Sequence, residues 1–352
     1  MEKSTRLSLR PEWLAYLLDK TGKKQSLLAP AISKRAGGLT REEINQLQKE
    51  EILDDKGNLT SKTRDIFACL ARPRAVVRLR LTDGQGFGEN NLYLGDKDEW
   101  ILLTNRGEDL FLKYPVTPYM ALQEVRELLG ESFFSSIMWE ENLSLEESVF
   151  LAALIDGARK KMLLAMAADS LETDIYLTQQ DLFRWAADPG SNAQWLTVII
   201  KGIIPEHLDL KLEKALISLE KKGFIKIDGS QVNLAPVTSF LASRLLVIDK
   251  VFSLRAVYQT GEGITQIGFV TVQGGVNDVL MLECDGQYVH WQGISPSDLL
   301  AMTKTIISNL QEIAQLLPED ADKPYCPSCQ LEVLPEARFC SFCGTPLKTE
   351  GS

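Results

Sequence analysis

Histidine is scarce in this sequence, and the sequence also lacks the residue patterns of a catalytic site. The 352 residues contain two histidines, His207 and His290, and neither has the spacing of a metal site or a catalytic triad. His207 lies in an expected loop, whereas the alternation around His290 predicts a strand. No segment combines a nucleophile with a base and an oxyanion donor. We therefore expect a protein that is not an enzyme.

Long hydrophobic runs are also missing. The most apolar stretch, residues 195–204, is interrupted by Lys201 and is shorter than the roughly 20 residues that a membrane helix needs. Charged residues divide the first 20 positions and leave no apolar core for a secretory signal. We expect no membrane partner and a cytoplasmic location.

Positive charge is in deficit. The chain carries 38 basic and 48 acidic side chains and a net charge of -10. Such a protein repels phosphate backbones overall, although a local basic patch remains compatible with this charge. Nucleic acid is therefore not the default partner. The length suits two average domains and a small module.

Cysteine is confined to a few positions, and four of the six form two CxxC units. Cys69 and Cys284 stand alone in apolar surroundings, which predicts core thiols in a reducing compartment. Ten residues separate the two CxxC pairs, a spacing that brings four thiolates to one tetrahedral zinc. The predicted ligands are Cys326, Cys329, Cys340 and Cys343.

Four sulfur ligands leave no open coordination position, so one zinc ion would be structural. It would contribute on the order of 10 kcal/mol to folding of a segment too small for a core. A redox dithiol needs a single CxxC at a helix start, and a disulfide framework fits the compartment poorly. Through Cys326-Pro327 and Phe339-Cys340 the segment resembles the short zinc-ribbon modules of many bacterial and archaeal proteins, with Gln330 in place of the usual glycine.

The body contains two segments with the same pattern of elements. Each shows a helix, a short strand or hairpin, and a second helix. The expected ranges are 39–51, 52–59 and 60–70 in the first copy and 208–222, 223–234 and 236–246 in the second.

Alternating strands then follow in both copies, each interrupted by a glycine-bearing hairpin loop. The run Gly84-x-Gly86-x-Gly88 lies between strands and does not open a helix, so we interpret it as such a loop and not as a dinucleotide site. Each copy closes with a helix that begins at Thr117-Pro118 or Ser295-Pro296, a cap residue followed by proline.

Between the copies, a capping box at Ser144 to Glu147 opens a helix, and Thr178 opens another. We predict an α+β fold of two related halves, each a winged-helix-like unit with an antiparallel sheet and a closing helix, around a helical segment. The expected segments are an N-terminal helical segment (1–38), a first repeat (39–130), a helical connector (131–207), a second repeat (208–316), an acidic linker (317–324) and a C-terminal zinc ribbon (325–347).

In this layout the body resembles the EspG-type chaperones of type VII secretion. The stretches 47–129 and 212–310 carry the likeness, with Leu70-Ala-Arg-Pro73 leading into the first sheet. The resemblance implies two related α+β halves and the binding of a helical client protein. It assigns no client-contacting residues.

Two functions remain open from the sequence. The favoured one is a protein-binding adaptor or chaperone, with a role in secretion as the resemblance implies, the ribbon as an accessory contact and a helical protein as partner. The alternative is a regulator that binds nucleic acid through its winged-helix-like units. The helix at 41–51 is acidic, and the helix at 208–222 interleaves both charges, so protein binding is preferred. The oligomeric state stays open.

Overall fold

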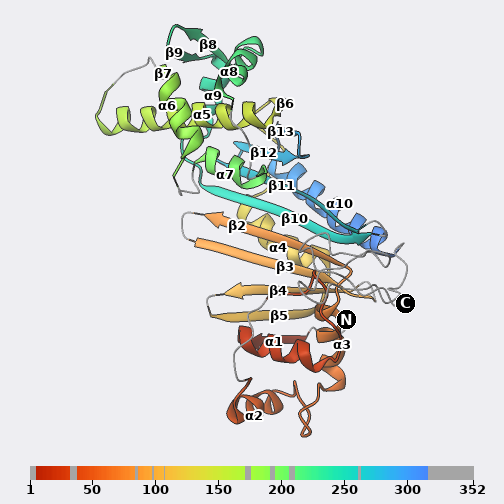
Figure 1. Ribbon diagram of the computed structural model, residues 1–352. Coiled ribbons are helices and arrows are strands. Elements are labelled where there is room, and N and C mark those ends of the chain that lie inside the picture. Colours follow the sequence, from red (N-terminus) through yellow and green to blue (C-terminus); the bar gives the residue numbers. More distant parts are fainter. Residues whose placement is uncertain are drawn as a thin grey trace, which may run out of the picture.

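The computed structural model describes residues 5–31, 38–83, 86–96, 99–106, 108–170, 176–190, 195–205, 211–260 and 263–315. These residues form a mixed α+β fold with a large antiparallel sheet and a small sheet (Figure 1), so the predicted class is confirmed. His207, the linker and the four zinc-ribbon cysteines lie outside this set. No helix within it has the length and apolar character needed to span a membrane.

The large sheet has ten strands and the same internal order in both halves. The first half contributes β1 (Thr5–Leu9), β2 (Ala75–Asp83), β3 (Gly86–Leu94), β4 (Trp100–Arg106) and β5 (Asp109–Val116). The second contributes β6 (Glu140–Ser144), β10 (Lys250–Thr260), β11 (Gly263–Gln273), β12 (Val279–Cys284) and β13 (Tyr288–Gly293). The order is β1-β5-β4-β3-β2-β10-β11-β12-β13-β6, and every neighbouring pair is antiparallel.

The two halves meet where β2 pairs with β10. Leu79 lies opposite Leu254, and Arg78 lies opposite Arg255. Because this pair is antiparallel and the strand order is mirrored on either side of it, the sheet has a local twofold relation centred on β2 and β10. Two copies of one strand pattern therefore form one continuous sheet.

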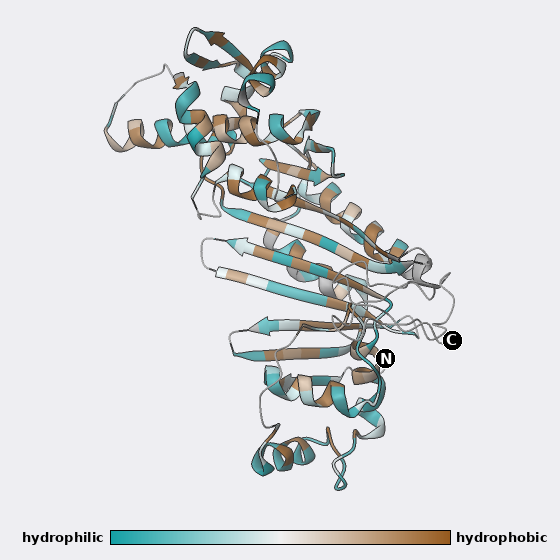
Figure 2. Ribbon diagram, viewed as in Figure 1, coloured by the Kyte–Doolittle hydropathy of each residue, from teal (hydrophilic) through white to brown (hydrophobic). Residues whose placement is uncertain are grey.

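The predicted closing helices cover one face of the sheet. These are α4 (Pro118–Leu129) and α10 (Pro296–Gln315), which contact each other, and α10 also contacts β2 and β10. Proline occupies the first turn of α4 after Thr117, and the hydroxyl of Ser295 accepts a 3.1 Å hydrogen bond from the Asp298 amide in α10. Both dipeptides thus open equivalent helices, as predicted. Apolar and polar residues alternate along the strands (Figure 2), and apolar residues such as Leu79 and Leu254 are buried against this layer.

Helices also cover the opposite face, where they form two separate lobes. The first lobe contains α1 (Pro11–Lys20), α2 (Arg41–Lys49) and α3 (Ser61–Ala71). The second contains α5 (Leu145–Ala167), α6 (Gln179–Ala187), α7 (Leu196–Ile203), α8 (Leu212–Lys221) and α9 (Pro236–Arg244). Each lobe buries its own apolar cluster against the outer strands of its half. The lobes stand at opposite ends of the sheet (Figure 1).

Residues 131–207, expected to connect the halves, supply the far edge strand β6 and the central helix of the second lobe. Strand β1 occupies the corresponding edge of the first half, and a helix follows each edge strand. The structural similarity of the halves therefore begins earlier in each half than the sequence pattern indicated.

The predicted hairpin of the second copy is confirmed as β8 (Ile225–Asp228) and β9 (Gln231–Leu234). Together with β7 (Tyr176–Thr178), which the sequence did not predict, they form a three-stranded sheet in the order β7-β9-β8. In the first copy the corresponding segment makes a single β-bridge between Leu53 and Leu59. The helix–hairpin–helix order is shared, but its β-structure is reduced in the first half.

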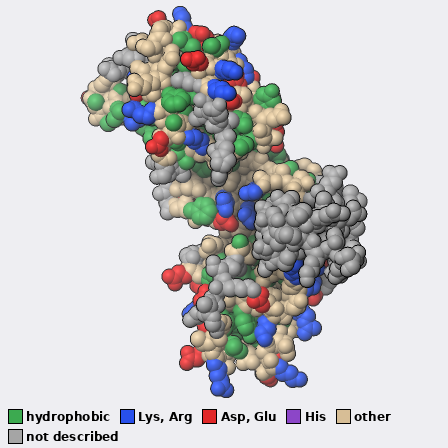
Figure 3. Space-filling view, in the orientation of Figure 1, with side chains coloured by type: hydrophobic (Ala, Val, Ile, Leu, Met, Phe, Trp, Pro, Cys, Tyr) green, Lys and Arg blue, Asp and Glu red, His purple; other side chains and the backbone are tan. Residues whose placement is uncertain are grey.

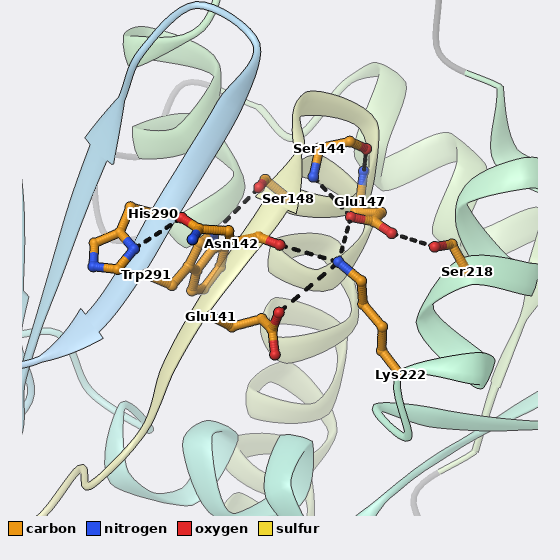
Figure 4. Close-up of polar contacts among 9 residues, drawn as sticks. All are labelled: Glu141, Asn142, Ser144, Glu147, Ser148, Ser218, Lys222, His290 and Trp291. Atoms are coloured by element: carbon orange, nitrogen blue, oxygen red, sulfur yellow. Dashed lines mark hydrogen bonds and ion pairs between the residues drawn. The ribbon is translucent and has the colours of Figure 1, made fainter.

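A polar network fixes α8 to the start of α5 (Figure 4). The predicted capping box is present: the Glu147 amide donates to the Ser144 hydroxyl over 3.2 Å, and the Glu147 carboxylate accepts from the Ser144 amide over 2.7 Å. The same carboxylate accepts hydrogen bonds from Ser218 and, over 3.0 Å, from Lys222 of the second lobe. One buried carboxylate therefore caps α5 and holds α8.

A second part of this network joins α5 and β6 to β13 (Figure 4). The Trp291 indole donates to the hydroxyl of Ser148 over 3.1 Å, and a ring nitrogen of His290 lies 2.9 Å from the side-chain oxygen of Asn142. Trp291 is fully buried, so its N–H requires such a partner. The edge strand and the helix that follows it are thereby fixed to the sheet.

Acidification is expected to weaken this junction. Burial is the largest influence on the pKa of Glu147 and raises it, but the bonds from Ser218, the Ser144 amide and Lys222 together hold the pKa below its ordinary 4.5. A carboxyl whose pKa is lower in the folded state contributes stability above its unfolded pKa and loses it as the pH falls through the folded value. Glu147→Gln should therefore lower the free energy of unfolding by about 1–3 kcal/mol at neutral pH.

Urea unfolding at pH 7 and near pH 3 measures this effect, and the difference between wild type and Glu147→Gln should shrink at the lower pH. Glu213→Gln, on the exposed surface of α8, is the matched control and should change little at either pH. An equal loss at both pH values would show that the charge of Glu147 contributes nothing.

Candidate functional site

Within the described residues, the middle of the sheet is left uncovered on the side that carries the two lobes. There the helices pack over the outer strands, and α3 reaches the end of β3. Side chains from β2, β3, β10 and β11 between the lobes are exposed or half-buried. We call this surface the central face; its polar residues are Arg78, Arg80, Glu89, Asn91, Ser253, Arg255 and Gln266.

Strand alternation explains why polar residues gather on this face. Successive side chains of a strand point to opposite sides of the sheet. In β2, Leu79 belongs to the core beneath α4 and α10, whereas Arg78 and Arg80 flank it and point the other way. In β10, Leu254 and Ala256 are buried in that same core, and Arg255 between them is exposed.

Three arginines lie close together at the centre of this face. Arg78 and Arg255 are directly opposite each other, and Arg80 lies two residues further along β2. The guanidinium of Arg80 donates to Glu89 over 2.8 Å, and Arg255 donates to the neutral side chain of Gln266. Figure 3 shows Lys and Arg side chains at the waist between the lobes.

The electrostatics of the cluster are unfavourable in the protein alone. Partial burial lowers the pKa of Arg255, and the charges of Arg78 and Arg80 lower it further. Like charges directly opposite on neighbouring strands destabilise a sheet. A local surplus of positive charge therefore exists in a chain whose net charge is -10.

Apolar side chains border the arginines. Phe87 in β3 is 64% exposed and Ile264 in β11 is 47% exposed. Both have the strand parity of the central face, near the ends of the β2–β3 and β10–β11 hairpins. A surface with a basic centre and apolar margins can bind a partner through both charge and apolar contact.

Among the described residues, the others singled out by the sequence, His290, Cys69 and Cys284, do not form a common cluster. His290 lies in a strand, as predicted, and its second ring nitrogen is 3.5 Å from Glu140. Cys69 and Cys284 pack beside the cores, and burial raises the pKa of Cys69 to about 12, so its thiol stays protonated. Among the described residues, no cluster of three or more His, Cys, Asp or Glu side chains could hold a metal.

The structure places Gly86 and Gly88 of the glycine run differently from the prediction. The β2–β3 hairpin is confirmed, but it is tight: Asp83 pairs with Gly86, so Gly86 and Gly88 lie within β3 and not in a loop. Neither glycine opens a helix, in agreement with the exclusion of a dinucleotide site.

Sequence reasoning did not single out the arginine cluster. Arginine at alternate positions of 75–81 was visible, and it indicated one polar face of a strand. The pairing of β2 with β10 brings Arg255 to the same place, and that pairing joins residues far apart in the chain. A comparison of basic residues at equivalent positions of the two copies could have found the arginine cluster.

Comparisons with known proteins identify the zinc ribbon by sequence, and a distant structural likeness is found for most of the chain. Residues 325–347 match the zinc-ribbon domain family, which implies zinc binding at the C-terminal part of the chain. No curated protein matches the chain in sequence. The Mycobacterium tuberculosis type VII secretion system chaperone EspG5, solved in complex with the PE25-PPE41 dimer, aligns with a TM-score of 0.48 and 12% identity, covering 90% of this chain and 98% of that one.

Proposed function

We propose that this chain is a cytoplasmic protein-binding adaptor or chaperone, without enzymatic activity, and that the central face receives the partner protein. The observation that carries the proposal is the central face itself: among the described residues, the two helical lobes leave the middle of β2, β3, β10 and β11 uncovered. An antiparallel sheet often leaves a polar face in water, but large exposed apolar side chains at the margins of such a face can mark a protein contact. An open centre with exposed Phe87 and Ile264 is therefore suited to a protein partner.

The dimensions favour a helical partner. Four strands at about 4.8 Å spacing separate the outer strand axes by about 14 Å. An α-helix with its side chains is about 10–12 Å wide. One helix of a partner, lying between the lobes, would cover β2 and β10 and reach the exposed residues on β3 and β11.

The nucleic-acid alternative receives less support from α8, which corresponds to the recognition helix of a winged-helix unit. Lys214 and Lys221 on its exposed side alternate with Glu213 and Glu220, and Ile217 between them is 52% exposed. Lys222 is occupied by Glu147. Mixed charge around an exposed isoleucine fits a protein contact better than a phosphate backbone.

The ribbon completes the proposal. We assign Cys326, Cys329, Cys340 and Cys343 as ligands of one structural zinc, with the ribbon as an accessory contact for the partner. The segments 1–38, 39–130, 131–207, 208–316, 317–324 and 325–347 remain the proposed domain organisation.

Site-specific photocrosslinking in the native host tests the central face. A photoreactive amino acid at Ser253 should give a recurring protein adduct, because Ser253 lies in the middle of that face. The same group at Thr305, exposed on α10 on the opposite side of the sheet, and at Glu213 on α8 provides the controls. Adducts restricted to α10 or α8, or nucleic acid attached at α8, would contradict the proposal.

A further inference from the structure

We infer that the partner segment seated on the central face is acidic, and that its carboxylates bind Arg78 and Arg255. This inference rests on the proposed function, since it specifies the chemistry of the partner at the same site. It follows from the position of the arginines, from their neighbours and from the charge balance of the face.

The position of the pair is the first argument. Opposed residues of an antiparallel pair have Cα atoms about 4.5–5.5 Å apart, so Arg78 and Arg255 project from neighbouring points on the same side of the sheet. Arg80 is within diagonal reach of Arg255. A guanidinium binds a carboxylate through two parallel hydrogen bonds, so neighbouring arginines can bind successive acidic side chains or share one.

The charge balance is the second argument. In the part of the chain that the structure describes, Glu89 pairs with Arg80, whereas no carboxylate pairs with Arg78 or Arg255. Gln266 accepts a hydrogen bond from Arg255 but brings no charge. An anion from outside would relieve the repulsion that the pair experiences across β2 and β10.

The space around Arg255 is the third argument. Its cross-strand neighbour in β11 is Gly268, which has no side chain to cover the guanidinium. A Cβ added at Gly268 would meet the carbonyl oxygen of Leu254, so the close approach of β10 and β11 excludes a larger residue there. Gln266 of β11 contacts the Arg255 guanidinium, but the directly paired position beside it carries no side chain, and Arg255 stays exposed.

A protein carboxylate suits this cluster better than a nucleic-acid phosphate. Three arginines and one glutamate occupy a short patch, and apolar Phe87 and Ile264 lie at its margins. Nucleic-acid surfaces need an extended basic tract, because each neutralised phosphate adds to the affinity. The net charge of -10 opposes a polyanion beyond the patch itself.

Fluorescence anisotropy with labelled poly-L-glutamate of about 20 residues, at about 50 mM salt, tests the inference. The full chain should bind, and the double variant Arg78→Gln/Arg255→Gln should bind about tenfold more weakly or worse, since each charge-assisted contact is lost. The matched control is Lys214→Gln/Lys221→Gln, which removes the same charge from exposed positions of α8. It should change the affinity less than about threefold.

Folding is verified in the same samples. Removing opposed like charges relieves repulsion, so the melting temperature of the arginine variant should stay the same or rise. An equal loss of affinity in both double variants would mean general electrostatics and would overturn the inference. Undetectable binding of poly-L-glutamate to the wild type would also overturn it, as would tighter, arginine-dependent binding of a 20-base-pair DNA duplex.

The two proposals fail separately. The crosslink from Ser253 reports whether a protein occupies the central face and does not require Arg78 or Arg255. A recurring Ser253 adduct with no preference for poly-L-glutamate would reject an acidic partner and leave the proposed function intact. If no protein adduct forms at Ser253, the proposed function is rejected.

Discussion

Asp156→Ala is expected to lower the free energy of unfolding by about 3–5 kcal/mol. Asp156 lies within α5 in the core of the second lobe, and both it and Arg159 are buried. Its carboxylate accepts hydrogen bonds from the amides of Leu196 (3.0 Å) and Thr197 (2.8 Å), from the Thr197 hydroxyl (2.7 Å) and from Arg159 (2.7 Å). The substitution leaves these donors without their acceptor.

The size of the effect comes from the group that remains. Burial raises the pKa of Asp156 and lowers that of Arg159, because removal from water disfavours both charges; the hydrogen bonds and mutual attraction oppose this cost. Without Asp156, the Arg159 charge stays buried and loses its ion pair, while its hydrogen bond to the Leu246 carbonyl (3.2 Å) and its contact with the Trp195 ring remain. Removing one partner of a buried ion pair is more costly than replacing both partners with apolar residues.

Urea denaturation distinguishes these contributions. Asp156→Asn should be milder than Asp156→Ala, since the amide oxygen still accepts from Thr197. The double variant Asp156→Ala/Arg159→Met should recover part of the stability lost in the single variant, because it also removes the buried guanidinium that had paired with Asp156. A double variant that is as unstable as the sum of two independent losses would refute this explanation.

Cys340→Ser should abolish most of the zinc content while leaving the melting transition of the body nearly unchanged. We assign Cys340 as one of four thiolate ligands, and a closed sulfur site that loses one ligand binds zinc far more weakly. Metal binding supplies on the order of 10 kcal/mol to such modules, so the ribbon itself should unfold. The proline-bounded acidic linker 317–324 separates it from the body.

Elemental analysis and a thermal scan on the same sample provide the measurements. Purified wild type should contain about one zinc per chain, as expected for four cysteine ligands. Cys284→Ser, at a half-buried thiol of β12, should retain the metal and is the matched control. An unchanged zinc content in Cys340→Ser would contradict the assignment of Cys340 as a ligand. A large drop in the melting temperature of the body would show that the ribbon packs against the body.

Local signals predicted much of the architecture. Capping residues at Ser144, Thr178 and Ser295 marked helix starts that the structure confirms. Sequence patterns identified most of β2, β4 and β12, and parts of β3, β10 and β11. These features depend on residues that are close in sequence, and for that reason a pattern within one segment was sufficient to find them.

The edge strands escaped prediction because their sequences lack a strand pattern. Strand β6 has one buried apolar residue, Leu143, among glutamate, asparagine and serine. Its conformation depends on pairing with β13, in which Leu143 lies opposite Val289. Strand β1 is similarly short, and Leu9 is the one buried residue among its five. Tertiary pairing, and not local propensity, determines these elements.

The central face could be predicted only in part from one sequence. Arginines at alternate positions of β2 indicated a polar side, but an ordinary solvent-exposed sheet has the same pattern. The distinguishing facts are that β10 pairs with β2 and that both lobes leave this region uncovered. Neither fact has a local signature, because each depends on the packing of segments from different halves.

The twofold relation between β2 and β10 also constrains how the chain is synthesised and folded. After the first half emerges, β2 is an unpaired edge of nine residues, and it stays so until β10 is made. During that interval the half-sheets of two nascent chains can join edge to edge in the geometry that β10 later provides. Productive folding thus competes with edge-to-edge pairing of two β2 strands, and the opposed arginines of such a false pair would repel each other as Arg78 and Arg255 do.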